Sequence, residues 1–212
     1  MPAKLFEREL VKGWLHEPHE PVSSNGDALA ITHGAGSNCE APLLRALAEA
    51  FCDAGLWVLR YDLPYRQLRP HGPPFPAQAA RDRAGIVAAA AAVREFATRH
   101  VYLSGSSYGG RQTSMAAADD ASLADALLLL SYPLHAPGKP DQPRTQHFGQ
   151  LRTPVLFAHG SRDPFGSPEE MRAALPLIPA RSELEIVQGA PHGLPPKVAM
   201  HLASYFVQFT AR

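Results

Sequence analysis

The fold is decided by the stretch Val101-Tyr102-Leu103-Ser104-Gly105-Ser106-Ser107-Tyr108-Gly109-Gly110, which has the pattern of a buried strand, a tight turn and the start of a helix. Within it, the spacing Gly105-x-Ser107-x-Gly109 is typical of a nucleophile elbow, a strained turn that leaves a serine hydroxyl exposed. Glycines on both sides of the serine allow the strand and the helix to approach closely. Ser107 is therefore the candidate nucleophile. The alternative is a turn rich in glycine and serine that only closes the helix N-terminus.

A serine becomes a strong nucleophile only when a histidine takes its proton and a carboxylate orients that histidine. In this strand–turn–helix context the three residues follow one another as serine, acid and histidine, each at the end of a strand. Asp163 follows the apolar run Pro154–His159, and His192 follows the apolar run Leu184–Gln188. We therefore predict that Ser107, Asp163 and His192 are the catalytic residues.

The chain has 10 histidines, and most of the others fail this test of placement. His16, His19 and His33 precede the serine, His100 begins its strand, His201 lies inside a helix, and His135 and His147 precede the acid. His159 ends its predicted strand and is interpreted as a structural histidine. Asp163 also fits an Asx-type turn with Pro164, a role that is compatible with catalysis.

A reacting carbonyl develops negative charge on its oxygen, and backbone N–H donors stabilise that charge. The first predicted donor is Tyr108, the residue after the nucleophile. The second is predicted in the loop His33–Asn38, which follows the predicted strand Ala28–Thr32; we select Ala35, and Gly36 is the alternative. The same loop lacks the Lys-Ser/Thr pair of a phosphate-binding loop and a full Gly-x-Gly-x-x-Gly motif, so no cofactor is predicted.

Short apolar runs alternate with helical patterns, which is typical of a parallel sheet covered by helices on both faces. The predicted strands are Ala28–Thr32, Leu56–Tyr61, Val101–Gly105, Ala126–Tyr132, Pro154–His159 and Leu184–Gln188. The predicted helices are Ala41–Asp53, Gln78–Arg99, Tyr108–Ala118, Ser167–Leu175 and Lys197–Phe209, the second with Ile86, Val87, Ala90, Val93 and Phe96 facing inward. The segment before these elements ends in Asn25-Gly26, a strong tight-turn signal, and it predicts an additional antiparallel edge hairpin.

Charge and composition exclude several classes of protein. The 212 residues carry 20 Lys+Arg and 20 Asp+Glu, so bulk charge does not hold the chain to nucleic acid or to an anionic membrane. The length and the 45% of hydrophobic residues fit a single domain over residues 1–212. The best candidate for a membrane span, Ile86–Val93, is too short, and the charged start of the chain lacks a signal-peptide pattern, so the expected location is the cytoplasm. Cys39 and Cys52 are predicted to be reduced thiols, and no spacing typical of a metal site is present.

Two long loops are expected to line a site, because loops of this length in a compact domain are often functional. They are Asp62–Ala77, rich in Pro and Arg, and Pro133–Thr153, rich in Pro and polar residues. Basic side chains gather in or beside the first loop, where they are expected to be solvated, or alternatively to favour an acidic substrate: Arg60, Arg66, Arg69 and His71.

Taken together, these residues resemble the α/β-hydrolase superfamily, and in particular its small, lid-poor branch of dienelactone-hydrolase-like, testis-expressed and NSL-complex-subunit-like proteins. The resemblance runs from about Leu29 to the C-terminal helix. It rests on the stretches His33–Ser37, Arg60–Tyr65, Gly105–Arg111, Tyr132–Pro140 and Gly160–Gly166. It implies a three-layer α/β/α sandwich with a mostly parallel, doubly wound sheet and no large lid, and it implies a Ser107–His192–Asp163 triad.

The chain departs from that branch at the nucleophile turn. The branch often has a basic residue before the nucleophile and Met after it, whereas this chain has Ser106 and Tyr108, which is expected to reshape the pocket wall. A dienelactone hydrolase carries Cys at the nucleophile position, so Ser107 argues against that reaction. Some relatives in this branch serve as scaffold subunits, so the resemblance supports the fold more strongly than the activity.

The expected function is hydrolysis of a small-molecule acyl ester by a serine hydrolase with an acyl-enzyme intermediate, a carboxylesterase-like reaction. The segment between Tyr132 and Pro154 has no room for a large lid domain, which favours small or accessible esters over long-chain lipids. One alternative is a thioesterase or peptidase that uses the same triad. The other is a non-catalytic binding or scaffold protein of the same fold.

Overall fold

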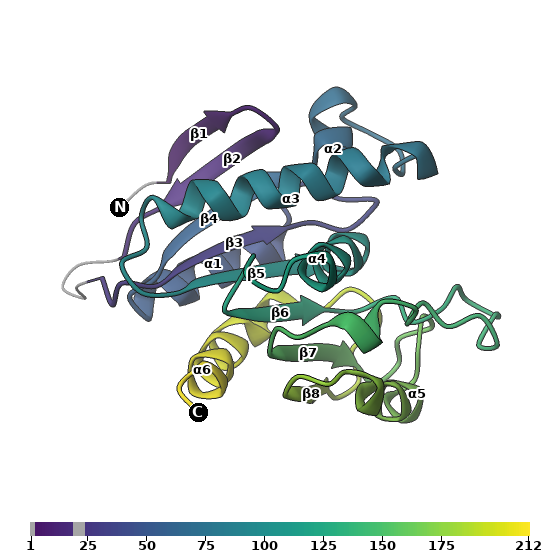
Figure 1. Cartoon of the computed structure of the whole chain (residues 1–212). Coiled ribbons are helices and arrows are strands. Elements are labelled where there is room, and N and C mark those ends of the chain that lie inside the picture. Colours follow the sequence, from purple (N-terminus) through teal and green to yellow (C-terminus); the bar gives the residue numbers. More distant parts are fainter. Residues whose placement is uncertain (1–2, 19–23) are drawn as a thin grey trace.

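The computed structural model describes residues 3–18 and 24–212, and it shows an eight-stranded sheet between two layers of helices (Figure 1). The strands are β1 (Lys4–Arg8), β2 (Val11–His16), β3 (Ala28–Thr32), β4 (Trp57–Asp62), β5 (Val101–Ser106), β6 (Ala126–Leu130), β7 (Val155–Gly160) and β8 (Ser182–Val187). Their order in the sheet is β1-β2-β4-β3-β5-β6-β7-β8, and β3 to β8 run parallel. The predicted three-layer, mostly parallel architecture is therefore confirmed.

The helices are divided between the two faces of the sheet (Figure 1). They are α1 (Pro42–Asp53), α2 (Pro64–Leu68), α3 (Ala79–Arg94), α4 (Tyr108–Asp119), α5 (Pro168–Ala174) and α6 (Ala199–Thr210). Helices α1 and α6 pack together against one face, and α3 and α4 pack together against the other. Each face has its own cluster of buried apolar side chains, which explains why the central strands are apolar throughout. In the two described ranges, no helix combines the length and the apolar character that a bilayer crossing needs.

The register of the parallel strands brings distant loops to one edge of the sheet. Thr32 at the end of β3 pairs with Gly105 near the end of β5, and Gly160 at the end of β7 pairs with Val187 at the end of β8. The loop after β3 therefore lies beside the turn after β5, and the loops after β7 and β8 lie side by side. In open α/β sheets this carboxyl edge is the place where ligands bind.

Two details of the sequence interpretation are corrected by the structure. The predicted edge hairpin exists as the antiparallel pair β1 and β2, but its turn lies at Glu9-Leu10, where Leu10 has a φ of 62°, and not at Asn25-Gly26. The Asn25 side chain instead accepts the N–H of Asp27 at 2.8 Å just before β3, and part of the intervening segment lies outside the described residues.

Val87 on α3 is 48% exposed, so it does not share the inward face. The helix turns this residue away from the sheet and toward solvent.

Helix α2 was not predicted from the sequence. It lies inside the segment that was interpreted as a long loop. It is five residues long and begins with Pro64, whose fixed φ suits the first helical position. Isolated helices of this length are unstable in water, so tertiary contacts hold it. The Gln67 amide donates to the carbonyl oxygens of Leu10 and Asp62, and the N–H of Tyr65 donates to the carboxylate of Asp82 on α3.

Both cysteines are buried thiols. Cys39 precedes α1 and Cys52 lies within it, and no disulfide joins them, as predicted. Burial raises the pKa of each thiol to about 12. Both therefore stay protonated at neutral pH.

The turn between β5 and α4 has the strained geometry that its glycines permit. Ser107 has a φ of 49° and a ψ of −114°, a conformation that L-residues rarely adopt. A Cβ on Gly105 would lie 2.6 Å from the backbone of Gly109, and a Cβ on Gly109 would lie 2.4 Å from the carbonyl oxygen of His33. The turn therefore requires residues without side chains on both sides of the serine.

We predict that Gly109→Ala destabilises the protein by about 2 kcal/mol, because the new methyl group collides with backbone atoms that have no freedom to move. Gly149→Ala is the matched control, since a Cβ at Gly149 meets nothing within 4 Å. Urea unfolding of both variants measures the difference. Equal midpoints for the two would show that the close approach at Gly109 does not constrain the fold.

Candidate active site

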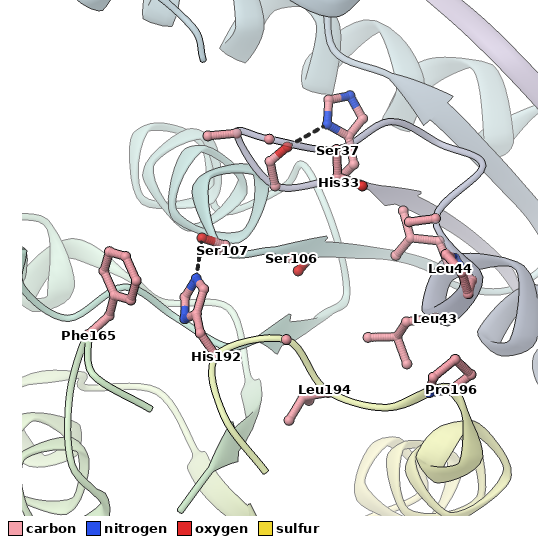
Figure 2. Close-up of a pocket in the computed structure, with 16 residues that line it drawn as sticks. His33, Ser37, Leu43, Leu44, Ser106, Ser107, Phe165, His192, Leu194 and Pro196 are labelled. Atoms are coloured by element: carbon pink, nitrogen blue, oxygen red, sulfur yellow. Dashed lines mark hydrogen bonds between the residues drawn. The ribbon is translucent and has the colours of Figure 1, made fainter. Parts of the chain in front are cut away.

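The three predicted catalytic side chains form one hydrogen-bonded chain at the carboxyl edge of the sheet (Figure 2). The Ser107 Oγ lies 2.7 Å from the His192 Nε2, and the His192 Nδ1 lies 2.8 and 3.0 Å from the two carboxylate oxygens of Asp163. Ser107 is the N-cap of α4, Asp163 follows β7 and His192 follows β8. This arrangement fixes the tautomer: the Nδ1–H donates to the carboxylate, and Nε2 accepts the serine hydroxyl.

The loop after β7 positions Asp163 beside His192. One carboxylate oxygen of Asp163 also accepts the N–H of Phe165 at 2.8 Å, so the predicted Asx-type turn and the contact with His192 are both present. The Phe165 ring lies over the His192 ring, with centroids 4.2 Å apart. His159 is fully buried, and its Nε2 donates to the carbonyl oxygen of Gly166 at 2.7 Å. Through this contact His159 joins the end of β7 to the loop that carries Asp163, although its Nδ1 has no hydrogen-bond partner among the described residues.

The loop after β3 has two backbone N–H groups that point away from Tyr65. The carbonyl oxygens of Gly34 and Ala35 both accept the Tyr65 hydroxyl, at 3.2 and 3.0 Å. Since a trans peptide places its N–H opposite its carbonyl, the N–H groups of Ala35 and Gly36 point away from Tyr65. The predicted donor Ala35 and its alternative Gly36 are both available by this geometry. Tyr108 is the first residue of α4, so its N–H has no partner within the helix.

His33 fixes the start of this loop. Its Nε2 accepts the N–H of Leu63 at 3.1 Å, and its Nδ1 donates to the carbonyl oxygen of Gly34 at 2.9 Å. Burial lowers the pKa of His33, which keeps the ring neutral, as this pattern of one acceptor and one donor requires. Position in the chain excluded His33 as the catalytic base, and it gave no sign of this positioning role.

Two members of the basic cluster predicted beside the first long loop are buried, whereas His71 is exposed, as expected, and Arg69 is half-buried. Arg60 is 3% exposed and its Nε donates to His16 at 2.8 Å, and Arg66 is 5% exposed. The Arg66 guanidinium donates to the carbonyl oxygens of Ser37 and Ala35, at 2.7 and 3.0 Å. These arginines are buried because backbone carbonyl groups of neighbouring loops accept their N–H groups. Arg66 thus holds the β3 loop from the same side as Tyr65.

Asp82 joins these pieces and was missed by sequence reasoning. This fully buried residue of α3 accepts the N–H of Tyr65 at 3.0 Å and the hydroxyl of Tyr108 at 2.7 Å. Burial raises the pKa of its carboxyl, and the hydrogen bonds from Tyr108 and Tyr65 oppose that rise. Acidic residues are common in the first turn of a helix, so the sequence does not distinguish Asp82 from an exposed acid. Only the burial of its side chain shows its role.

An apolar cavity of about 520 Å³ opens beside the serine (Figure 2). Its walls come mainly from the β3 loop, the start of α1 and the segment after His192, and its apolar lining is Ala41, Pro42, Leu43, Leu44, Leu194 and Pro196. Figure 2 shows Ser107 and His192 between Phe165 on one side and these leucines on the other. Neither of the two long loops lines this cavity. The first supports the β3 loop through α2, and the second contributes Pro133 and Arg144 to a smaller neighbouring cavity.

The two histidines of the second long loop have other partners. His135 lies 3.3 Å from Glu170, and the Nε2 of His147 lies 2.8 Å from the Ser114 hydroxyl. Burial, together with the charge of Arg111, lowers the pKa of His147 to about 4. No group of three or more His, Cys, Asp or Glu side chains in residues 3–18 and 24–212 is arranged to hold a metal ion.

We predict that His147 makes the fold sensitive to acid. Its pKa is near 6.5 when unfolded and about 4 when folded, so the unfolded chain binds more protons and stability falls as the pH decreases from 6.5 to 4. The variant His147→Gln keeps a polar group for Ser114. Its free energy of unfolding should fall by about 2 kcal/mol less than that of the wild type between pH 6.5 and pH 4. Urea unfolding at several pH values tests this, and parallel curves for the two proteins would contradict it.

The model of a family described as an alpha/beta hydrolase domain matches residues 25–204. Among solved structures, Est1E from Butyrivibrio proteoclasticus is 17% identical with a TM-score of 0.75, covering 99% of both chains. A dienelactone hydrolase from Anabaena variabilis is 20% identical with a TM-score of 0.73, covering 99% of this chain and 97% of its own. XC6422 from Xanthomonas campestris, described as a serine hydrolase without a lid, is 18% identical with a TM-score of 0.69, covering 99% and 92%. At these identities the structures show a shared fold.

Proposed function

Because the chain belongs to the alpha/beta hydrolase family, we propose that it is a serine hydrolase that cleaves small acyl esters. One observation carries the proposal: the continuous hydrogen-bonded chain from the Ser107 hydroxyl through His192 to Asp163. A structural serine at a helix N-cap needs no histidine on its hydroxyl, and a structural histidine needs no strained serine beside it. The combination is what nucleophilic catalysis requires.

The first half of the reaction forms an acyl-enzyme. Ser107 Oγ attacks the ester carbonyl while His192 Nε2 takes the hydroxyl proton, and Asp163 stabilises the resulting imidazolium. The carbonyl oxygen becomes negative and accepts the N–H groups of Tyr108 and Ala35, with Gly36 as the alternative to Ala35. His192 then returns the proton to the leaving alcohol as the carbon–oxygen bond breaks.

The second half repeats these steps with water. His192 takes a proton from a water molecule, whose oxygen attacks the acyl carbonyl of the Ser107 ester. When the tetrahedral intermediate collapses, the proton passes from His192 to Ser107 Oγ and the carboxylic acid product leaves. The ester and one water molecule are the only reactants that the two halves consume.

The apolar cavity supports a small acyl group as the part of the substrate that binds there. The cavity has apolar walls beside the polar side chains of Ser107 and His192. Such walls suit a hydrocarbon chain, because burying the chain there removes apolar surface from water. The nucleophile is Ser107 and not cysteine, which favours simple esters over the dienelactone reaction suggested by the resemblance. We also place the chain near the testis-expressed and NSL-complex-subunit-like branch, since two strings typical of it, Tyr132–Pro140 and Gly160–Gly166, lie beside the site.

The central prediction is that a fluorophosphonate probe labels Ser107 alone and that the wild type hydrolyses p-nitrophenyl butanoate. Ser107→Ala should abolish labelling and lower kcat/KM about a thousandfold or more, because the nucleophile is lost. Peptide mapping by mass spectrometry locates the label, and absorbance follows the turnover.

Ser122→Ala is the matched control, since Ser122 is exposed and bonds only to Asp120. This variant should label and turn over like the wild type. A folded wild-type protein that neither labels nor hydrolyses any ester would overturn the proposal and favour the binding or scaffold alternative.

We further predict that Tyr65→Phe lowers kcat about tenfold and changes KM less than threefold. The hydroxyl of Tyr65 donates to the carbonyl oxygens of Gly34 and Ala35. Without it, the N–H groups of the β3 loop are less well positioned for the developing oxyanion. Tyr205→Phe is the control, because its hydroxyl bonds to Glu183 on β8. Steady-state kinetics decide the matter: equal values of kcat for the two variants would mean that Tyr65 does not position the loop.

A further inference from the structure

A second, smaller cavity lies beside Ser107 on the α4 face of the sheet. Its volume is about 320 Å³, and its walls include Ala35, Ser107, Tyr108, Arg111, Pro133, Arg144 and Phe165. Ala35, Ser107 and Phe165 also line the apolar cavity, so the two cavities meet at the nucleophile. A substrate whose scissile bond reaches Ser107 therefore has room on two sides.

Two arginines give this second cavity its character. Arg111 follows Ser107 by one helical turn, and the backbone N–H of Arg111 donates to the Ser107 carbonyl oxygen at 2.9 Å. Arg144 is fixed through its backbone, which donates to Leu134 at 2.6 Å and accepts the Tyr132 hydroxyl at 2.6 Å. Both arginines are therefore carried by anchored segments, and both line the cavity that contains Ser107.

The charges of these two arginines are not compensated within the protein. In the part of the chain that the structure describes, neither guanidinium lies within 4.0 Å of a carboxylate oxygen, and the titratable neighbours of Arg144 are Arg111 and Tyr132. The Arg111 Nε is buried and has no hydrogen-bond partner in those residues. A buried donor without a partner is costly, so the protein itself leaves part of the Arg111 guanidinium without a hydrogen bond.

The electrostatic surroundings agree with two neighbouring positive charges. Burial lowers the pKa of Arg144, and the charge of Arg111 lowers it further. His147 adds no charge, because its pKa of about 4 keeps it neutral at pH 7. An anion between the two guanidinium groups would relieve their repulsion and accept their N–H groups.

We propose that Arg111 and Arg144 form a binding site for a carboxylate group of the substrate, beside Ser107 and adjoining the apolar cavity. This proposal rests on the proposed esterase function and names its substrate class: an ester with an apolar part and a carboxylate on opposite sides of the scissile bond. A carboxylate is planar and accepts two parallel N–H bonds from a guanidinium, which suits two arginines in a small cavity.

Two pairs of matched esters test the proposal and locate the carboxylate. For the acyl side, p-nitrophenyl hemiglutarate is compared with p-nitrophenyl pentanoate. For the alcohol side, 3-carboxyphenyl butanoate is compared with 3-carbamoylphenyl butanoate. The wild type should favour the carboxylate in one pair by about tenfold or more in kcat/KM, since charge-assisted hydrogen bonds contribute roughly that factor.

The variants assign that preference to the two arginines. Arg111→Gln and Arg144→Gln should each reduce the carboxylate-to-neutral ratio about tenfold, and Arg144→Lys should retain part of it because the charge remains. Arg152→Gln is the control, since Arg152 is exposed and does not line the cavity; its ratio should match that of the wild type. Thermal melting checks that each variant is folded. A wild type without preference in either pair, or a preference that survives in both Gln variants, would overturn the proposal.

A binding experiment separates this proposal from the esterase function. Ser107→Ala and the double variant Ser107→Ala/Arg144→Gln are titrated calorimetrically with the two carboxylate esters, which neither protein can cleave through Ser107. Binding at least about tenfold weaker in the double variant supports the carboxylate site even if the wild type hydrolyses no ester. Equal binding by the two proteins refutes the carboxylate site even if the wild type is an active esterase.

Discussion

The conformation of Ser107 is the constraint on which the rest of the site depends. A φ of 49° at a serine is stable only where the surroundings leave no alternative, and here the backbone of α4 lies against β5 and against His33. The contact between Gly109 and the His33 carbonyl does more than accommodate the turn. It sets the distance between Ser107 and the β3 loop, and therefore between the Ser107 hydroxyl and the N–H groups of that loop. One backbone contact thus positions two functions at once.

Around this contact, buried polar side chains do the positioning that apolar packing cannot do. Tyr65, Arg66 and Asp82 belong to α2 and α3, and all of their main contacts go to backbone groups or to Tyr108 near the serine. Hydrogen bonds have direction, so they fix the orientation of a loop as well as its distance. This explains why a five-residue helix with little intrinsic stability lies in a segment so rich in proline and arginine.

The sequence predicted the central strands, most helices and the three side chains that meet at the sheet edge, because each of these has a local signal. Apolar runs and a Gly-x-Ser-x-Gly spacing are visible without tertiary information. Arg66 and Asp82 were beyond reach, since burial of a charged side chain depends on partners from other parts of the chain. The turn at Leu10 was misplaced for a similar reason: Asn-Gly is the stronger local signal, but the register of β1 and β2 places the turn elsewhere.

The two cavities that meet at Ser107 are built on opposite faces of the sheet. Leu44 and Leu194 line the apolar cavity and belong to the apolar cluster that α1 and α6 share, whereas Tyr108 lines the second cavity and packs with the cluster of α3 and α4. Away from the shared lining of Ala35, Ser107 and Phe165, substitutions in the two cavities fall in different packing clusters, so their energetic effects should combine almost additively. Natural variation or laboratory selection can therefore alter recognition of one half of a substrate while leaving the other half as it was. Because the sheet separates the two packing clusters, the two cavities can change independently of each other.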